Sequence, residues 1–365
     1  MSKRVLFPLI GSIAIVLLLV PASSFTVRPA AESLSARITD QEFWRLISDF
    51  SEPNGFFRSD NLLSNELWFQ YVIPDLTKTA KAGRVYLGVG PEQNFTYITA
   101  LKPKMVFIFD IRRGNLDLQL MYKALFELSS DRADFVSRLF SRLRPDGLSS
   151  SSTAQRIFAA YRNAESSEAY YDGNFKAIKD VLMTKHHWPI SDADLEGIDY
   201  VYRHFYQFGP RINYNSSLNT GIGGFGGFGR TTYADLMSTD DGQGQARSYL
   251  ASEENFSFLK ELEAKNLLVP VVGDFAGPKA IRAVATYLKE KDATVSAFYL
   301  SNVEQYLRQN GVWDNFCRNV STLPLDDSST FIRSVRDGQY GFGRGLNSEL
   351  GKMTEDVAEC GLPQK

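Results

Sequence analysis

The sequence has 365 residues and a mass of 41.0 kDa, which is enough for one large core or for one core with a long insertion. Its composition, 44% hydrophobic and 22% charged, is that of a folded globular protein and excludes a disordered chain. The formal net charge of -2 leaves no excess of basic residues, so we expect no nucleic-acid partner.

Residues 1–22 have the three parts of a secretory signal. Two basic residues precede an apolar run from Val5 to Val20, and small residues follow up to Ala22. The pattern predicts a signal peptide cleaved after Ala22 or a retained membrane anchor, since the run is short for a span of ~20 residues. In both cases the protein is exported (periplasmic or secreted) or held at the membrane only through this segment. If the segment is not a targeting signal, the protein is cytoplasmic.

The rest of the chain divides into a linker over 23–38, an α/β domain over 39–345 and a C-terminal tail over 346–365. The domain is expected to begin with a helix from Asp40. A second helix follows the Glu52–Gly55 turn, and we expect Pro74 to end it.

Two short apolar runs, 84–90 and 104–110, flank a helical stretch and indicate the fold. Continuous apolar strands separated by a helix are typical of a parallel sheet that is buried on both faces. The pattern returns at 267–272, 295–300 and 330–335. It predicts a doubly wound, mostly parallel Rossmann-like sheet, with ligand-binding loops at the carboxyl edge of its strands.

Between the two halves of the sheet, residues 112–265 are mostly helical, and we interpret them as an insertion that caps the ligand edge. The glycine-rich stretch 221–229 has no preceding strand and no Lys-Ser/Thr ending, so it predicts a mobile lid or a disordered loop rather than a phosphate site.

Gly88 and Gly90 follow the first predicted strand, and Asp110 ends the second. Glycines at this place let the backbone turn tightly and approach a ligand, and an acid on the next strand can accept hydrogen bonds from ribose hydroxyls. The pattern predicts a nucleoside site, the alternative being an ordinary tight turn and a helix-capping Asp. Because Asp110 ends a strand, we expect its replacement by Ala to leave the fold intact.

These residues carry a resemblance. The run from Val85 to Glu92, with Asp110, resembles the first two motifs of the class I S-adenosylmethionine (SAM) dependent methyltransferases. Five longer strings are similar to an uncharacterised bacterial family with this methyltransferase-like fold: FRSDNLLSNE, YLGVGPEQNFTYI, FIFDIRRGN, VPVVGDFAGPKAI and AFYLSNVEQYL. The match covers most of the chain from Phe56 to Val335.

The resemblance implies that SAM is the cofactor, and together with the polar stretch from Ser59 to Glu66 it gives two groups of candidate residues. Those expected to contact SAM are Gly88, Gly90, Glu92, Asp110, Asp274 and Phe275. Those expected on the substrate side are Ser301, Asn302, Asn61, Asn65 and Glu66. No catalytic residue is assigned.

The chain departs from the methyltransferase pattern at several places. Tyr86 stands where the family usually has an acid, and Glu92 stands where it has a third glycine. Asn302 is not followed by the Pro-Pro-aromatic signature, so N-methylation of bases or of glutamine lacks support. The insertion between the second and third strands is also atypical in length.

The polar stretch from Ser59 to Glu66 has two interpretations. It folds over the nucleoside and closes the site, or it is the start of a helix capped by Ser59 or Asp60 with a solvated face.

Cys317 and Cys360 are the only cysteines. They pair if the domain is exported, and they are buried free thiols otherwise. No Cys/His spacing typical of a metal site is present, so we expect no metal.

Two functions remain open. The first is a SAM-binding, methyltransferase-like protein of unknown substrate. The second is an exported, non-catalytic ligand-binding protein that retains the fold. SAM is made in the cytoplasm, whereas the N-terminus indicates export, and this conflict separates the two.

Overall fold

The computed structural model describes residues 33–216, 231–336, 339–341 and 346–360, together with Met1. Contacts divide the chain into two units, Met1–Ala31 and Glu32–Lys365, and the description below concerns the second. The apolar N-terminal run and the glycine-rich stretch 221–229 lie outside the described residues. In the part of the chain that is described, no helix is long and apolar enough to cross a membrane.

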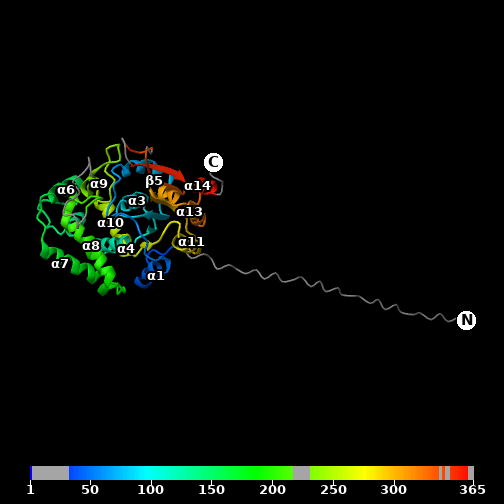
Figure 1. Ribbon diagram of the computed structural model, residues 1–365, viewed down its shortest axis with the longest axis horizontal. Coiled ribbons are helices and arrows are strands. Elements are labelled where there is room, and N and C mark those ends of the chain that lie inside the picture. Colours follow the sequence, from blue (N-terminus) through cyan, green and yellow to red (C-terminus); the bar gives the residue numbers. More distant parts are fainter. Residues whose placement is uncertain (2–32, 217–230, 337–338, 342–345, 361–365) are drawn as a thin grey trace. The chain divides into compact units, whose positions relative to one another are not determined.

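The described fold is mixed α/β (Figure 1). The six strands are β1 Val85–Val89, β2 Met105–Asp110, β3 Leu268–Val272, β4 Val295–Ser301, β5 Thr330–Arg336 and β6 Leu346–Lys352. The α-helices are α1 Asp40–Phe50, α2 Ile73–Thr79, α3 Gln93–Leu101, α4 Arg113–Leu128, α5 Arg132–Leu139, α6 Ala154–Tyr161, α7 Glu168–Lys179, α8 Asp192–Phe208, α9 Tyr233–Ser238, α10 Glu253–Ala264, α11 Ala280–Glu290, α12 Val303–Gln309, α13 Trp313–Val320 and α14 Met353–Glu359. Three further helical segments of 3₁₀ or π type are η1 Phe69–Val72, η2 Asp180–Lys185 and η3 Gly209–Arg211.

The strands form one sheet in the order β3-β2-β1-β4-β5-β6. β1 to β5 are parallel to one another, and β6 is antiparallel to β5. The prediction of a mostly parallel sheet is therefore confirmed. The sheet also extends past residue 345 into the segment expected to be a tail, where β6 lacks a continuous apolar run because it is an antiparallel edge strand.

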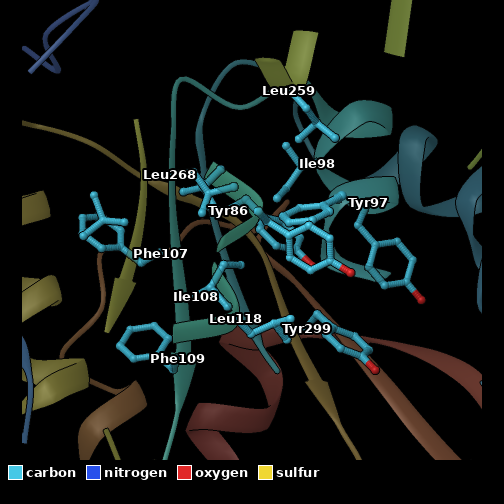
Figure 2. Close-up of a cluster of buried hydrophobic side chains, with 14 of the residues drawn as sticks. Tyr86, Tyr97, Ile98, Phe107, Ile108, Phe109, Leu118, Leu259, Leu268 and Tyr299 are labelled. Carbon is cyan, nitrogen blue, oxygen red and sulfur yellow. The ribbon is translucent and has the colours of Figure 1, made fainter. Parts of the chain in front are cut away.

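Aromatic side chains fill both faces of the sheet. Figure 2 shows Phe107 and Phe109 on one side of β2, while Ile108, Tyr97 and Tyr299 lie on the other. The first side is covered by α1 and α11, where Phe107 contacts the rings of Phe50 and Tyr287. The second side is covered by α3 and α4. Burial on both faces explains why these strands are continuously apolar.

The region between β2 and β3 begins with a helix that belongs to the sheet. α4 contacts β2 and β3, whereas α6, α7, α8 and α9 gather on the side of the molecule away from α11, α13 and α14 (Figure 1). The region between β2 and β3 therefore includes a helix that packs on the sheet, α4, as well as the helices α6 to α9.

Pro74 does not end a helix, contrary to the prediction. It lies in the first turn of α2, which starts at Ile73 and continues to Thr79. The first turn tolerates proline because its backbone N–H groups have no partner within the helix.

Cys317 on α13 and Cys360 after α14 form a disulfide with a Cα–Cα distance of 5.5 Å. The structure thus decides between the two states left open for these cysteines, and the bond ties the C-terminal helix to the body of the domain.

Candidate functional site

A cavity of about 870 Å³ lies at the carboxyl edge of the sheet. The residues at or just after the ends of four strands line it: Gly90 after β1, Asp110 of β2, Asp274 after β3 and Ser301 of β4. β1 and β4 are adjacent at the point where the strand order reverses. In open α/β sheets this is where ligands bind.

Most of the residues assigned from the sequence meet in this one cavity. The lining includes Gly90, Asp110, Asp274, Phe275, Ser301, Asn302, Asn61, Asn65 and Glu66. Gly88 and Glu92 are not part of the lining. These residues come from four strand ends and from a loop before the first strand, so only the tertiary fold brings them together.

The two glycines of the first turn have different reasons to be glycine. Gly90 has φ +76°, and a Cβ built on it would meet no atom within 4 Å, so it leaves open space at the cavity wall. Gly88 has no such space, because a Cβ there would collide with the side chain of Asn94. Asn94 in turn donates to the carbonyls of Val89 and Pro91. Gly88 therefore serves the packing of the turn.

Asp110 is buried and already has a partner. Its Oδ1 accepts hydrogen bonds from the Arg112 backbone N–H (2.9 Å) and Nε–H (3.2 Å), and its Oδ2 accepts from Nη2 (3.1 Å). Arg112 also donates to the backbone carbonyl of Asp60. A carboxylate offers about four acceptor positions, so one remains for a ligand.

These contacts argue against the expectation that Asp110→Ala leaves the fold intact. The side chains of Asp110 and Arg112 are 5% and 11% exposed. Removing the carboxylate would leave a buried guanidinium without its counter-charge, which is strongly destabilising.

The loop after β3 places Asp274 and Phe275 at the cavity. Asp274 Oδ1 accepts from the Ala276 N–H (2.8 Å), and the Phe275 ring packs edge-on against Phe298. The N-terminus of α11 is occupied from within the chain, because Glu52 Oε1 accepts from the N–H groups of Lys279 (2.7 Å) and Ala280 (2.9 Å). The N-terminus of α11 is therefore not free to bind an anionic group of a ligand.

The segment 51–66 crosses the ends of the strands in the order of the sheet. The N–H of Glu52 donates to the last residue of β3, and Gly55 donates to Ile111 after β2. Ser64 then donates to Glu92 after β1, and Glu66 reaches β4. The segment is a loop up to Ser64, not a capped helix, so of the two interpretations the structure favours a cover over the strand ends.

Glu66 is the most buried acid of the cavity wall, with 2% exposure. Its Oε1 accepts from the hydroxyls of Tyr299 (2.6 Å) and Ser301 (2.7 Å). Burial raises the pKa of Glu66, and the hydroxyls of Ser334, Tyr299 and Ser301 oppose this increase. Ser301 has φ +50°, a strained backbone conformation of the kind that clusters at functional sites.

Glu92 is fully buried behind the cavity, directly before α3. Its Oε1 accepts from the Ser64 N–H at 3.2 Å. Burial raises the pKa of Glu92 to about 8, and the charge of Glu66 adds to this shift. Glu92 is therefore protonated at neutral pH and holds the cover segment in place.

Sequence reasoning missed two residues of the cavity wall region. Gln93 lines the cavity, and Tyr299 links it to Glu66. Both lie within the strings that carry the resemblance, but a Gln at a helix start and a Tyr in an apolar strand read as ordinary packing residues. At the rim, Phe56 is 84% exposed, and Phe57 and Arg58 contact the ring of Tyr306.

The chain is similar to a known protein family over most of its length. The family described as Domain of unknown function (DUF7790) matches residues 61–190 and 229–355. The chain belongs to the DUF7790 family. The matched residues include the strand ends and the last part of the cover segment, whereas the description of DUF7790 states no activity. No curated protein matches the chain.

Within the described residues, no group of three or more His, Cys, Asp or Glu side chains is arranged to hold a metal ion. His186 lies in a separate buried network. Its Nδ1 is 2.7 Å from Asp40 Oδ1, and its Nε2 is 2.9 Å from Glu127 Oε2.

Proposed function

We propose that the cavity at the carboxyl edge of the sheet binds a nucleoside-type small molecule, with SAM as the first candidate. The observation that carries the proposal is the meeting of Gly90, Asp110, Asp274 and Ser301 in one cavity at the reversal of the strand order. The order β3-β2-β1-β4-β5-β6, with helices on both faces, supports a doubly wound Rossmann-like fold, in which this position takes nucleotides.

The residues fit a nucleoside in size and in part in chemistry. A volume of about 870 Å³ lies within the range of small-molecule pockets. Gly90 leaves room for a close approach to the backbone, and Phe275 offers an aromatic surface next to Asp274. Asp110 keeps one acceptor position for a ribose hydroxyl, because Arg112 occupies the others. The sequence pattern, in contrast, predicts hydrogen bonds to both ribose hydroxyls.

Bound SAM would supply an activated methyl group. The contribution of the protein would be positioning, which by itself lowers the barrier of a two-reactant step. Ser301 and Asn302 lie at the end of β4 and would face the reacting end of the cofactor, and the cover segment with Asn61 and Asn65 would exclude water.

The test is the thermal stability of the purified protein with SAM, S-adenosylhomocysteine or adenosine. A ligand at 100 times its dissociation constant adds about 2.7 kcal/mol to the free energy of unfolding. A rise of the melting midpoint with at least one of the three supports the proposal. An unchanged midpoint with all three, at millimolar concentration, overturns it.

A second candidate is an exported, non-catalytic protein that binds its ligand in the same cavity. The disulfide between Cys317 and Cys360 favours it, since such bonds persist in oxidising compartments. Tyr86 also favours it: where methyltransferases carry an acid, this tyrosine is buried and donates to Asn94 Oδ1 at 2.9 Å.

Mass spectrometry of the protein from its native host distinguishes between its possible cellular locations. A mature start near Ser23 supports export, and an intact Met1 in the membrane fraction supports the anchor. An intact, soluble cytoplasmic form removes the second candidate and leaves the methyltransferase-like protein.

A further inference from the structure

Accessible amide side chains gather on one part of the cavity lining. Asn302, Gln305 and Asn310 line the cavity from α12 and its two ends, and Asn65 lines it from the cover segment. Asn302 is half-buried, and the other three are exposed. Within the described residues, none of the four amide groups has a hydrogen-bond partner, and none is enclosed. A ligand in the cavity can therefore reach all four.

The charged residues of the same helix have partners elsewhere. Glu304 accepts a hydrogen bond from Arg333 Nε at 2.8 Å, and the Arg308 guanidinium lies 3.5 Å from the centre of the Trp313 ring. Neither Glu304 nor Arg308 lines the cavity. α12 thus presents uncharged amides to the cavity, and each amide offers one acceptor oxygen and two N–H donors.

Aromatic rings lie beside these amides. Phe57 and Tyr306 both line the cavity, and their rings meet edge to face with centres 5.2 Å apart. Arg58 Nη2 donates to the Tyr306 hydroxyl at 3.1 Å, which holds this ring in place. The faces of aromatic rings carry partial negative charge and attract the weakly positive hydrogens of C–H groups. This wall therefore combines free hydrogen-bonding groups with a surface for C–H groups.

We propose that α12 and the facing part of the cover segment form a subsite for an uncharged sugar. A hydroxyl group both donates and accepts, so two neighbouring hydroxyls match the N–H and the oxygen of one amide, while the C–H face of a sugar ring packs on an aromatic ring. An ionic group would instead need an opposite charge, and α12 presents none to the cavity. The inference rests on the proposed function in that the sugar lies beside the nucleoside in the same cavity, and it adds the class of the substrate.

The test is saturation-transfer NMR of the full chain with four probes at tens of millimolar: glucose, galactose, mannose and N-acetylglucosamine. The probes are measured with S-adenosylhomocysteine at saturation, because an empty ribose site would also accept hydroxyl groups. We expect at least one sugar to bind under these conditions. Binding of none, or binding that S-adenosylhomocysteine displaces, overturns the subsite.

Two glutamines of α12 provide a matched pair of variants. Gln305 and Gln309 are both exposed, but only Gln305 lines the cavity. Methionine is a comparable helix former, so both variants should fold with the melting midpoint of the wild type. Gln305→Met should weaken the bound sugar by about three- to tenfold, whereas Gln309→Met should stay within about twofold.

Asn302→Leu repeats the loss at a second amide. A weaker sugar affinity in at least one of the two cavity variants, with Gln309→Met unchanged, upholds the subsite. Unchanged affinity in both cavity variants, or an equal loss in Gln309→Met, would place the sugar elsewhere and overturn it.

The absence of charge on the ligand is tested with the 6-phosphate of the sugar that binds. Arg336 is an exposed cation of the lining without an ion pair among the described residues, and it would attract an anionic ligand. The phosphate should bind no more than about twofold tighter than the neutral sugar. A gain of about tenfold that Arg336→Gln removes would mean that the ligand is anionic, against the proposal.

The failure of the proposed function has a different signature. If adenosine and S-adenosylhomocysteine do not bind the wild type, the nucleoside proposal fails, and the sugars are then measured alone with the same variants. Binding that Gln305→Met weakens and Gln309→Met retains upholds the subsite as that of the second candidate, the exported binding protein. If a nucleoside binds and no sugar does, the sugar subsite alone is overturned.

Discussion

The hydroxyl of Tyr299 donates a 2.6 Å hydrogen bond to Glu66, a residue 233 positions earlier in the chain. This contact joins the end of the cover segment to the strand β4 and closes one side of the cavity. Because Tyr299 also accepts from Gln93, its hydroxyl holds two buried polar groups at once.

Replacing Tyr299 by Phe should therefore destabilise the protein. The change leaves the Gln93 amide without its acceptor and Glu66 with Ser301 as its remaining donor, so we expect the free energy of unfolding to fall by about 1–3 kcal/mol. Urea denaturation measures this quantity. Tyr306→Phe is the matched control, since the hydroxyl of Tyr306 accepts an exposed hydrogen bond from Arg58 and should contribute less than about 1 kcal/mol. Equal losses in the two variants would contradict a special role of Tyr299.

Gly90→Val should abolish ligand binding while lowering the free energy of unfolding only modestly. A branched side chain at φ +76° strains the turn by about 1–2 kcal/mol and projects into the cavity. Gly83 offers a matched control, because it also has a positive φ (+72°) and open space, but it does not line the cavity. Melting curves with and without nucleosides should show similar strain in Gly83→Val and retained binding. Binding that survives in Gly90→Val would make this glycine a structural turn residue.

The pair of Asp110 and Arg112 can be tested by a double-mutant cycle. Asp110→Ala should lower the free energy of unfolding by about 3–5 kcal/mol, because it leaves a buried guanidinium unpaired. Arg112→Met added to it should restore part of that loss. Chemical denaturation of the four proteins gives the coupling energy, and losses that simply add would mean that the pair contributes no interaction of its own.

Glu92 should make the protein less stable as the pH rises. Its pKa in the folded state is about 8, above the ordinary value of 4.5, so between these values the folded state holds a proton that the unfolded state has released. The stability contributed by Glu92 is present below pH 4.5 and is lost as the pH rises to about 8. In Glu92→Gln this loss is absent. The free energy of unfolding of the variant, relative to that of the wild type, should therefore rise by about 1 kcal/mol or more between pH 5 and pH 9. Parallel curves of stability against pH would contradict a buried, protonated Glu92.

The disulfide should stabilise the C-terminal part of the domain. It closes a loop with a sequence separation of 43, for which chain entropy predicts about 2–4 kcal/mol. The double variant Cys317→Ala/Cys360→Ala should melt earlier than the wild type. Reduction of the wild type should lower its midpoint to a similar value, and an unchanged midpoint on reduction would mean that the bond does not form in solution.

The sequence by itself determined the parallel part of the sheet and the edge of the sheet at which the cavity lies. Strands buried on both faces need continuous apolar runs, so 84–90, 104–110 and 267–272 could be recognised without any tertiary information. Parallel strands end on one edge, and this placed Gly90, Asp110 and Asp274 together in advance. β6 escaped recognition because an edge strand has no such run.

Only the tertiary structure decided the path of the cover segment and the partners of the buried acids. A loop has no hydrophobic period, and its course is set by contacts with residues far along the chain, such as that of Glu52 with Lys279 at a separation of 227. The hydrogen bonds from the Arg112 side chain to Asp110 likewise depend on a side-chain conformation that the sequence does not reveal. A buried carboxylate with a cation partner, such as Asp110, and one without an ion pair among the described residues, such as Glu66, look the same in a sequence.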